Sequence, residues 1–316
     1  ELSLAQKDVD RAEATAAKAL ELYPDDERSY RGYAAVSLQQ GDLAQAEQTL
    51  LDGVGRLPRQ RSLLLMLTDV LLQENKLTEA AQALARIREQ YDATSVPVQL
   101  LEARLLVAEQ RWSEAKQVLE QVRSMAMGNP DLVRQVDLYL GQCHAKLNEF
   151  DAQLEVNQRV LSDDPTSLAA RAGAAQALVS AGKAAEALVE FESIAGSLQQ
   201  PQLARLPQIW YPLLQLRVNS QSAKPEAERD WSQVDELLDL LQEANAVNPT
   251  QMALLRAESL IRRGEKKAAT DLLEEAATMS ADPLIWAGLA TLEFRTEGSE
   301  AARGVLDRTP DAARNS

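Results

Sequence analysis

The sequence contains one histidine, His144, and one cysteine, Cys143, and these neighbours are the side chains best suited to nucleophilic or metal chemistry. A catalytic Cys–His pair needs the two side chains within hydrogen-bond distance, and a zinc site needs further His or Cys ligands. Adjacent residues of a helix point apart, so the two cannot easily share a site. We therefore expect His144 to be a packed, partly buried histidine without a catalytic or metal-binding role.

The other motifs that carry chemistry are missing from the sequence. It has no glycine-rich phosphate loop, no Gly-x-Ser-x-Gly, no His-Glu-x-x-His and no Cys-x-x-Cys. Paired acids such as Asp163-Asp164 and Glu274-Glu275 fall at expected helix junctions or outer faces. The sequence thus predicts a protein that is not an enzyme and that binds neither a cofactor nor a metal.

The amino-acid composition limits the classes of partner that the protein could bind and the cellular compartments that suit it. The 33 basic and 48 acidic residues give a net charge of −15, which argues against nucleic acid or an anionic membrane surface as the main partner. No apolar run is long enough to insert into a membrane. A single cysteine excludes an intramolecular disulfide and slightly favours the cytoplasm, while the periplasm stays possible. A protein or peptide partner remains, with its identity and the oligomeric state left open.

Alanine recurs at a fixed phase and defines the elements that would position any site. The steps from Ala12 to Ala46 and from Ala46 to Ala80 are both 34 residues, and the same register continues at Ala115, Ala187, Ala269 and Ala302. Each alanine is followed at +4 and +7 by an apolar or small residue. A period of this length predicts stacked pairs of helices, in which alanine allows close approach.

Two local motifs make the chain resemble the tetratricopeptide repeat family. The Gly-Asp-Leu-x-x-Ala stretch from Gly41 to Ala46 matches its turn and second helix, and Trp286, Leu289 and Ala290 match its first helix. The resemblance covers nearly the whole chain, as about eight full units and a partial one. It implies an all-α fold, a right-handed superhelical solenoid of antiparallel helix pairs.

The register also predicts how the chain is organised. We expect a partial repeat at residues 1–26, which is the second helix of a truncated first unit. Regular repeats are expected at residues 27–200 and 250–316. Between them, an irregular repeat is expected at residues 201–249, with a loop inserted at 219–230. We expect the array to be a segment of a longer protein. Helix starts are predicted at Asn129-Pro130 and Asp282-Pro283, with Ser113 and Thr250 as further candidate N-caps.

The irregular repeat has features of its own. Pro201, Pro207 and Pro212 crowd one first helix, and the last of these should remove a backbone hydrogen bond and bend the helix. The inserted loop is either functional or merely mobile. Three aromatic residues flank it, and they either pack a widened junction or form a second binding region: Trp210, Tyr211 and Trp231.

The resemblance implies that the first helices line a concave inner surface that binds partners. At a fixed phase along these helices, the inward residues are Arg31, Leu65, Asp69, Leu100, Arg104, Leu138, Gln142 and Gln176. The Lys, Asn and Arg clamp that some family members use for acidic peptide C-termini is not visible at these positions. We expect a non-catalytic interaction scaffold that binds a peptide or protein along the groove. The alternative is an auxiliary region of a larger enzyme or export machine whose catalytic or membrane part lies elsewhere.

Overall fold

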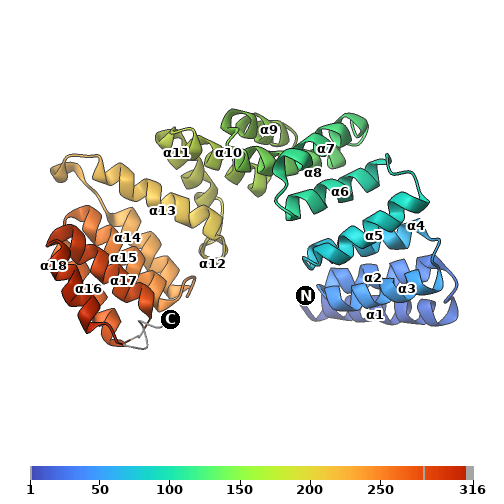
Figure 1. Cartoon of the computed structure of the whole chain (residues 1–316), viewed down its shortest axis with the longest axis horizontal. Coiled ribbons are helices and arrows are strands. Elements are labelled where there is room, and N and C mark those ends of the chain that lie inside the picture. Colours follow the sequence, from blue (N-terminus) through green and yellow to red (C-terminus); the bar gives the residue numbers. More distant parts are fainter. Residues whose placement is uncertain (1, 280–281, 311–316) are drawn as a thin grey trace. The chain divides into compact units, whose positions relative to one another are not determined.

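The structure is a computed structural model that describes the backbone of residues 2–279 and 282–310, and the side chains from residue 11 onward within those ranges. Over these residues it contains eighteen α-helices, one short 3₁₀-helix and no β-strand (Figure 1). The predicted all-α solenoid of helix pairs is confirmed.

The chain divides into two compact units, residues 1–173 and 174–316. The first unit holds α1 (Leu2–Leu22), α2 (Glu27–Gln40), α3 (Leu43–Arg56), α4 (Arg61–Gln73), α5 (Leu77–Gln90), α6 (Val96–Ala108), α7 (Trp112–Met125), α8 (Pro130–Lys146), α9 (Phe150–Asp163) and the start of α10 (Leu168–Ser180). The second unit holds the rest of α10, α11 (Ala184–Gly196), α12 (Gln200–Ala204), α13 (Pro207–Ser222), η1 (Glu226–Glu228), α14 (Ser232–Glu243), α15 (Pro249–Arg263), α16 (Lys266–Met279), α17 (Pro283–Thr296) and α18 (Ser299–Arg308).

The recurring alanines lie where the two helices of a pair approach each other. Those of α3, α5, α7, α11 and α16 have no exposed surface, and the leucine or phenylalanine one turn later is buried beside each. Because alanine carries only a methyl group, the helix axes come close and larger side chains interdigitate around it. Ala12 is the exception and is exposed, because no described first helix packs over that side of α1.

The turn inside a pair is made by one residue with left-handed backbone geometry. Glycine fills this position at Gly41, Gly182 and Gly264, and asparagine fills it at Asn75 and Asn148. Both residue types tolerate positive φ. The backbone then closes the end of the first helix, as when Gly264 N–H donates to Ile261 and Glu265 N–H donates to Leu260.

Within each unit, the first helices of successive pairs contact one another. In the first unit α2, α4, α6 and α8 are in contact in series, and in the second unit α13, α15 and α17 are. Second helices such as α3, α5, α7 and α16 pack instead between their own first helix and the next one, as α5 does between α4 and α6. The first helices therefore share one continuous face in each unit, which we call the inner face.

The irregular repeat differs in detail from its sequence prediction. α13 continues through Pro212 to Ser222, so residues 219–222 are helical and the connection to α14 is shorter than the predicted insertion. That connection contains η1 and is held by Arg229, whose Nε donates to the Lys224 carbonyl at 3.0 Å. A short helix that the sequence did not predict, α12, precedes α13.

Two of the four predicted helix N-caps were wrong. Asn129 and Asp282 accept hydrogen bonds from the starts of α8 and α17, as predicted. α7 begins one residue before Ser113, and α15 is capped by Asn248 through a reciprocal bond with Gln251. Thr250 lies inside α15 and so cannot cap it; its hydroxyl donates to the carboxylate of Asp282 at 2.7 Å and links two repeats.

Candidate functional site: the inner face

The inner face is defined by three positions of each first helix, fifteen, eleven and seven residues before the repeat alanine of the second helix. Leu65, Asp69 and Gln73 hold these positions on α4, counted back from Ala80. Successive helical residues three or four apart lie on one face. The positions eleven residues before the alanine meet across neighbouring helices, because Asp69 of α4 pairs with Arg104 of α6.

In the first unit, much of the predicted binding surface is used by the fold itself. Asp69 and Arg104 are only 33% and 17% exposed and neutralise each other. Leu65 and Leu100 are partly buried against the repeat core. The carboxylate of Glu27, 4.0 Å from Arg31, also accepts from Ser62 of the next first helix at 2.5 Å.

The remaining predicted inner residues are more accessible. Gln142 of α8 and Gln176 of α10 are exposed, and Leu138 is half-buried. Binding by these residues stays a prediction.

The second unit has an open hollow on its inner face, between α15 and α17. Its volume is about 390 Å³. The lining includes the three register positions of both helices, which are Leu254, Glu258 and Arg262 on α15 and Ala287, Thr291 and Arg295 on α17. Ile261, Leu273 and Leu292 supply further apolar lining. We call this hollow the α15/α17 groove.

A glycine lets α17 lie close to Leu254 in this groove. A Cβ added at Gly288 would fall 2.6 Å from the Leu254 Cδ2, nearer than two non-bonded carbon atoms can approach. The leucine side chain therefore rests against the bare backbone of α17. A larger residue at position 288 would push Leu254 into the hollow and fill part of it.

The charged side chains of the groove differ in their interactions with the rest of the chain. Glu258 Oε2 accepts from the Gln215 side chain of α13 at 3.4 Å. Arg262 and Arg295 are exposed, and neither forms an ion pair with a carboxylate among the residues that the structure describes. Both lie in the last turn of their helices, where a cation is favoured by the helix dipole. The groove thus presents two guanidinium groups beside one hydrogen-bonded carboxylate.

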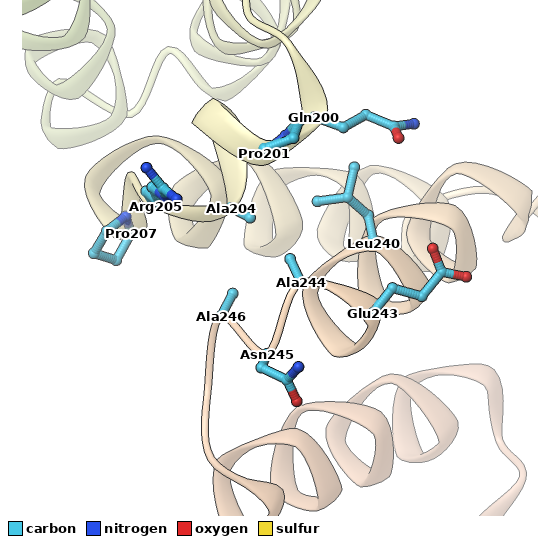
Figure 2. Close-up of a pocket in the computed structure, with 10 residues that line it drawn as sticks. All are labelled: Gln200, Pro201, Ala204, Arg205, Pro207, Leu240, Glu243, Ala244, Asn245 and Ala246. Atoms are coloured by element: carbon cyan, nitrogen blue, oxygen red, sulfur yellow. The ribbon is translucent and has the colours of Figure 1, made fainter. Parts of the chain in front are cut away.

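A second hollow, of about 600 Å³, lies between α12 and the end of α14. Figure 2 shows Ala204 and Ala244 facing each other across it, with Arg205 and Glu243 on opposite sides. It exists because of the extra helix α12 and has no counterpart in the repeat register. Its small apolar lining and opposed charges give it no clear charge preference.

The three aromatic residues of the irregular repeat play different structural parts. Trp210 is buried and meets Tyr211, which is 49% exposed, edge to face at 5.9 Å. Trp231 precedes α14, and the Arg263 guanidinium lies over its ring at 5.0 Å. A second binding region at these residues stays a prediction.

His144 is buried, as predicted, and takes part in a cluster that links two repeats. Its Nδ1 lies 2.6 Å from Glu149 Oε2, and Lys116 Nζ donates to both oxygens of that carboxylate at 2.8 and 2.9 Å. Hydrogen bonds from Lys116 and then from His144 hold the pKa of Glu149 below its ordinary value.

Burial raises the pKa of the neighbouring Cys143 thiol to about 11, so it is protonated and unreactive at neutral pH. Across the described ranges, no three His, Cys, Asp or Glu side chains converge as a metal site requires. None of the described helices is both long and apolar enough to cross a lipid bilayer.

Arg262 and Arg295 were missed by the sequence prediction, although a signal for them exists. The inner register was followed only as far as Gln176, before the irregular repeat. Counting back seven residues from the repeat alanines Ala269 and Ala302 gives Arg262 and Arg295. The register continues beyond the irregular repeat because the alanine spacing resumes there.

Comparison with known proteins supports the repeat assignment. A family model described as tetratricopeptide repeat matches residues 3–68 and 71–134. No curated protein matches the sequence.

Among solved structures, a tetratricopeptide repeat protein from Parabacteroides merdae is 15% identical with a TM-score of 0.53, over 84% of this chain and 98% of that one. The human IFIT1 dimer with PPP-AAAA is also 15% identical, with a TM-score of 0.51, over 97% of this chain and 68% of that one. At this identity the likeness establishes a shared fold.

Proposed function

The chain carries tetratricopeptide repeats over residues 3–68 and 71–134, and from this premise we propose that it is a non-catalytic scaffold that binds an extended protein segment in the α15/α17 groove. The observation that carries the proposal is that the inner-face positions of two neighbouring helices line a hollow. The six positions that face inward on α15 and α17 line one hollow, and that hollow is accessible.

The physical basis is a mixed lining that suits a peptide. Apolar side chains such as Leu254 and Leu284 offer sites for aliphatic groups, and burial of their accessible surface contributes about 25 cal/mol per Å². Polar groups at the rim, including Thr291, would fix the register of the bound segment.

The proposal is tested by selection of random displayed peptides on the chain. Ala287 is exposed and lines the groove, so Ala287→Trp should fill the hollow without disturbing the core. Ala268 is an exposed alanine of α16 that does not line the groove, and Ala268→Trp is the matched control. Selected peptides should lose binding to Ala287→Trp and keep it on Ala268→Trp. Peptides that bind both variants equally would place the site elsewhere.

A further inference from the structure

We infer that the α15/α17 groove selects a partner segment that combines acidic and aliphatic side chains. This inference rests on the proposed function and specifies the chemistry of the ligand. Its starting point is that Arg262 and Arg295 occupy equivalent positions on neighbouring inner helices and line the same hollow.

The two arginines are placed to accept carboxylates from outside the chain. Both are exposed and lack an ion-pair partner among the described residues, whereas Arg104 on the inner face of the first unit is paired with Asp69. A guanidinium binds a carboxylate through two parallel hydrogen bonds, which gives strength and orientation. Glu258 offsets only part of this charge, and its carboxylate already accepts from Gln215.

The apolar lining adds a second requirement on the ligand. Leu254, Ile261 and Leu284 lie in the same hollow as the two arginines, and Leu284 is 58% exposed. A segment of acidic residues alone would leave this apolar surface uncovered, and a purely aliphatic segment would leave both guanidinium groups without partners. An acidic residue next to an aliphatic one satisfies both groups of side chains.

The charge of the rest of the chain makes this preference selective. With 33 basic and 48 acidic residues, most of the surface repels an acidic segment. A basic segment would be attracted to many places on such a surface. An acidic segment is attracted only where cations stand unpaired, so the surrounding repulsion sharpens the choice of site.

The experiment measures the binding of three labelled peptides by fluorescence anisotropy. The first alternates leucine with aspartate, the second replaces each aspartate by asparagine, and the third replaces it by lysine. The aspartate peptide should bind the wild-type chain, and its affinity should fall as salt rises because the groove is open to solvent. Arg262→Gln and Arg295→Gln should each weaken it about tenfold, which corresponds to about 1.4 kcal/mol.

Two matched controls separate this effect from a general change of charge. Arg205 lines the α12/α14 hollow and Arg303 is exposed on α18, and Arg205→Gln and Arg303→Gln should each leave binding within about twofold. The inference is overturned if the asparagine peptide binds as tightly as the aspartate peptide, if the aspartate peptide does not bind, or if Arg205→Gln weakens binding as much as Arg262→Gln.

The two proposals fail in distinguishable ways. If displayed peptides depend on Ala287 but contain no acidic residues, the groove is the binding site and the ligand class is wrong. If no peptide depends on Ala287, the groove itself is wrong. The melting temperatures of Arg262→Gln and Arg295→Gln should change only slightly, because each variant loses only a favourable contact with the helix dipole.

Discussion

The inner faces of the two units are built on the same register and use it differently. In the first unit, Asp69 and Arg104 stand eleven residues before their repeat alanines on neighbouring helices and pair with each other. The corresponding residues on α15 and α17 are Glu258 and Thr291, which cannot form an ion pair. One face is consequently closed by its own charges, and the other keeps a hollow with two accessible arginines nearby.

This difference shows how a repeat protein can separate folding from binding. The buried alanine and leucine positions are repeated in both units, so the helix pairs form in the same way. The inner positions are free to vary because they contribute little to the packing of a pair. Whether a face stabilises the array or binds a ligand then depends on which charges neighbouring helices bring together.

The largest expected effect tests the premise that both units share one core. Ala80 and Ala187 are fully buried between the helices of their pairs. Ala80→Trp and Ala187→Trp should each lower the free energy of unfolding by about 1–3 kcal/mol or more, because a closely packed core cannot accommodate the indole ring. Chemical denaturation of both variants measures this, with the exposed Gln48→Glu as the control. A small effect in only one unit would mean that the cores differ.

The next effect isolates the ion pair that closes the first inner face. Asp69→Asn, Arg104→Gln and the double variant form a thermodynamic cycle. Because Arg104 is only 17% exposed, we expect a coupling free energy of about 1 kcal/mol, at the upper end of values for exposed pairs. Unfolding in urea at low and high salt provides the measurement. A coupling free energy near zero would show that the pair does not stabilise the first unit. The claim that its inner face serves folding would then be wrong.

A third prediction concerns the polar links between second helices. Lys116 lies on α7 and Glu149 precedes α9, and an equivalent pair with the signs reversed joins Glu47 of α3 to Lys76 before α5 at 2.6 Å. The second unit shows no such pair at this register among its described residues. The first unit alone should therefore gain acid-sensitive stability from these links.

The sign of the pH dependence follows from the lowered pKa of Glu149. A carboxyl group with a lower pKa in the folded state stabilises fully above its unfolded value of about 4.5, and the contribution is lost as pH falls through the folded value. Glu149→Gln should destabilise the chain at neutral pH, and the difference should disappear only once the pH has fallen below the lowered pKa of Glu149 in the folded chain. Melting curves across this range test it, with the exposed Glu120→Gln as the control. An equal loss at every pH would point to packing as the cause.

Sequence analysis predicted the repeated elements well, because helix pairing depends on short-range rules. The alanine spacing reflects the need for two helices to approach closely. The turn residues Gly41 and Asn75 reflect the need for a positive φ. Even Gln110, a residue poorly suited to positive φ, adopts the same turn at φ 61° because the register of the pairs requires it. Local patterns therefore predicted the fold class, an array of helix pairs.

The details that sequence analysis missed depend on partners distant in the chain. Thr250 looked like a helix cap, and its hydroxyl instead binds Asp282 in the following pair. Asp69 looked available for a ligand and is instead taken by Arg104. Which polar side chains are left unpaired is decided between repeats, so the candidate groove emerged only once neighbouring helices were placed side by side.

The smallest expected change in stability provides the sharpest test of the comparison. Thr291→Arg places an arginine opposite Glu258, in the arrangement that Asp69 and Arg104 have in the first unit. The new pair should raise the free energy of unfolding by about 0.3–0.5 kcal/mol at most, because it is exposed and competes with Gln215 for the carboxylate. Its side chain should also cover the hollow between α15 and α17 and reduce binding of groove-dependent peptides. Thr291→Gln, which also enlarges the side chain but adds no charge, is the control for bulk. If Thr291→Arg leaves peptide binding unchanged, the open inner face of the second unit is not what distinguishes it from the first.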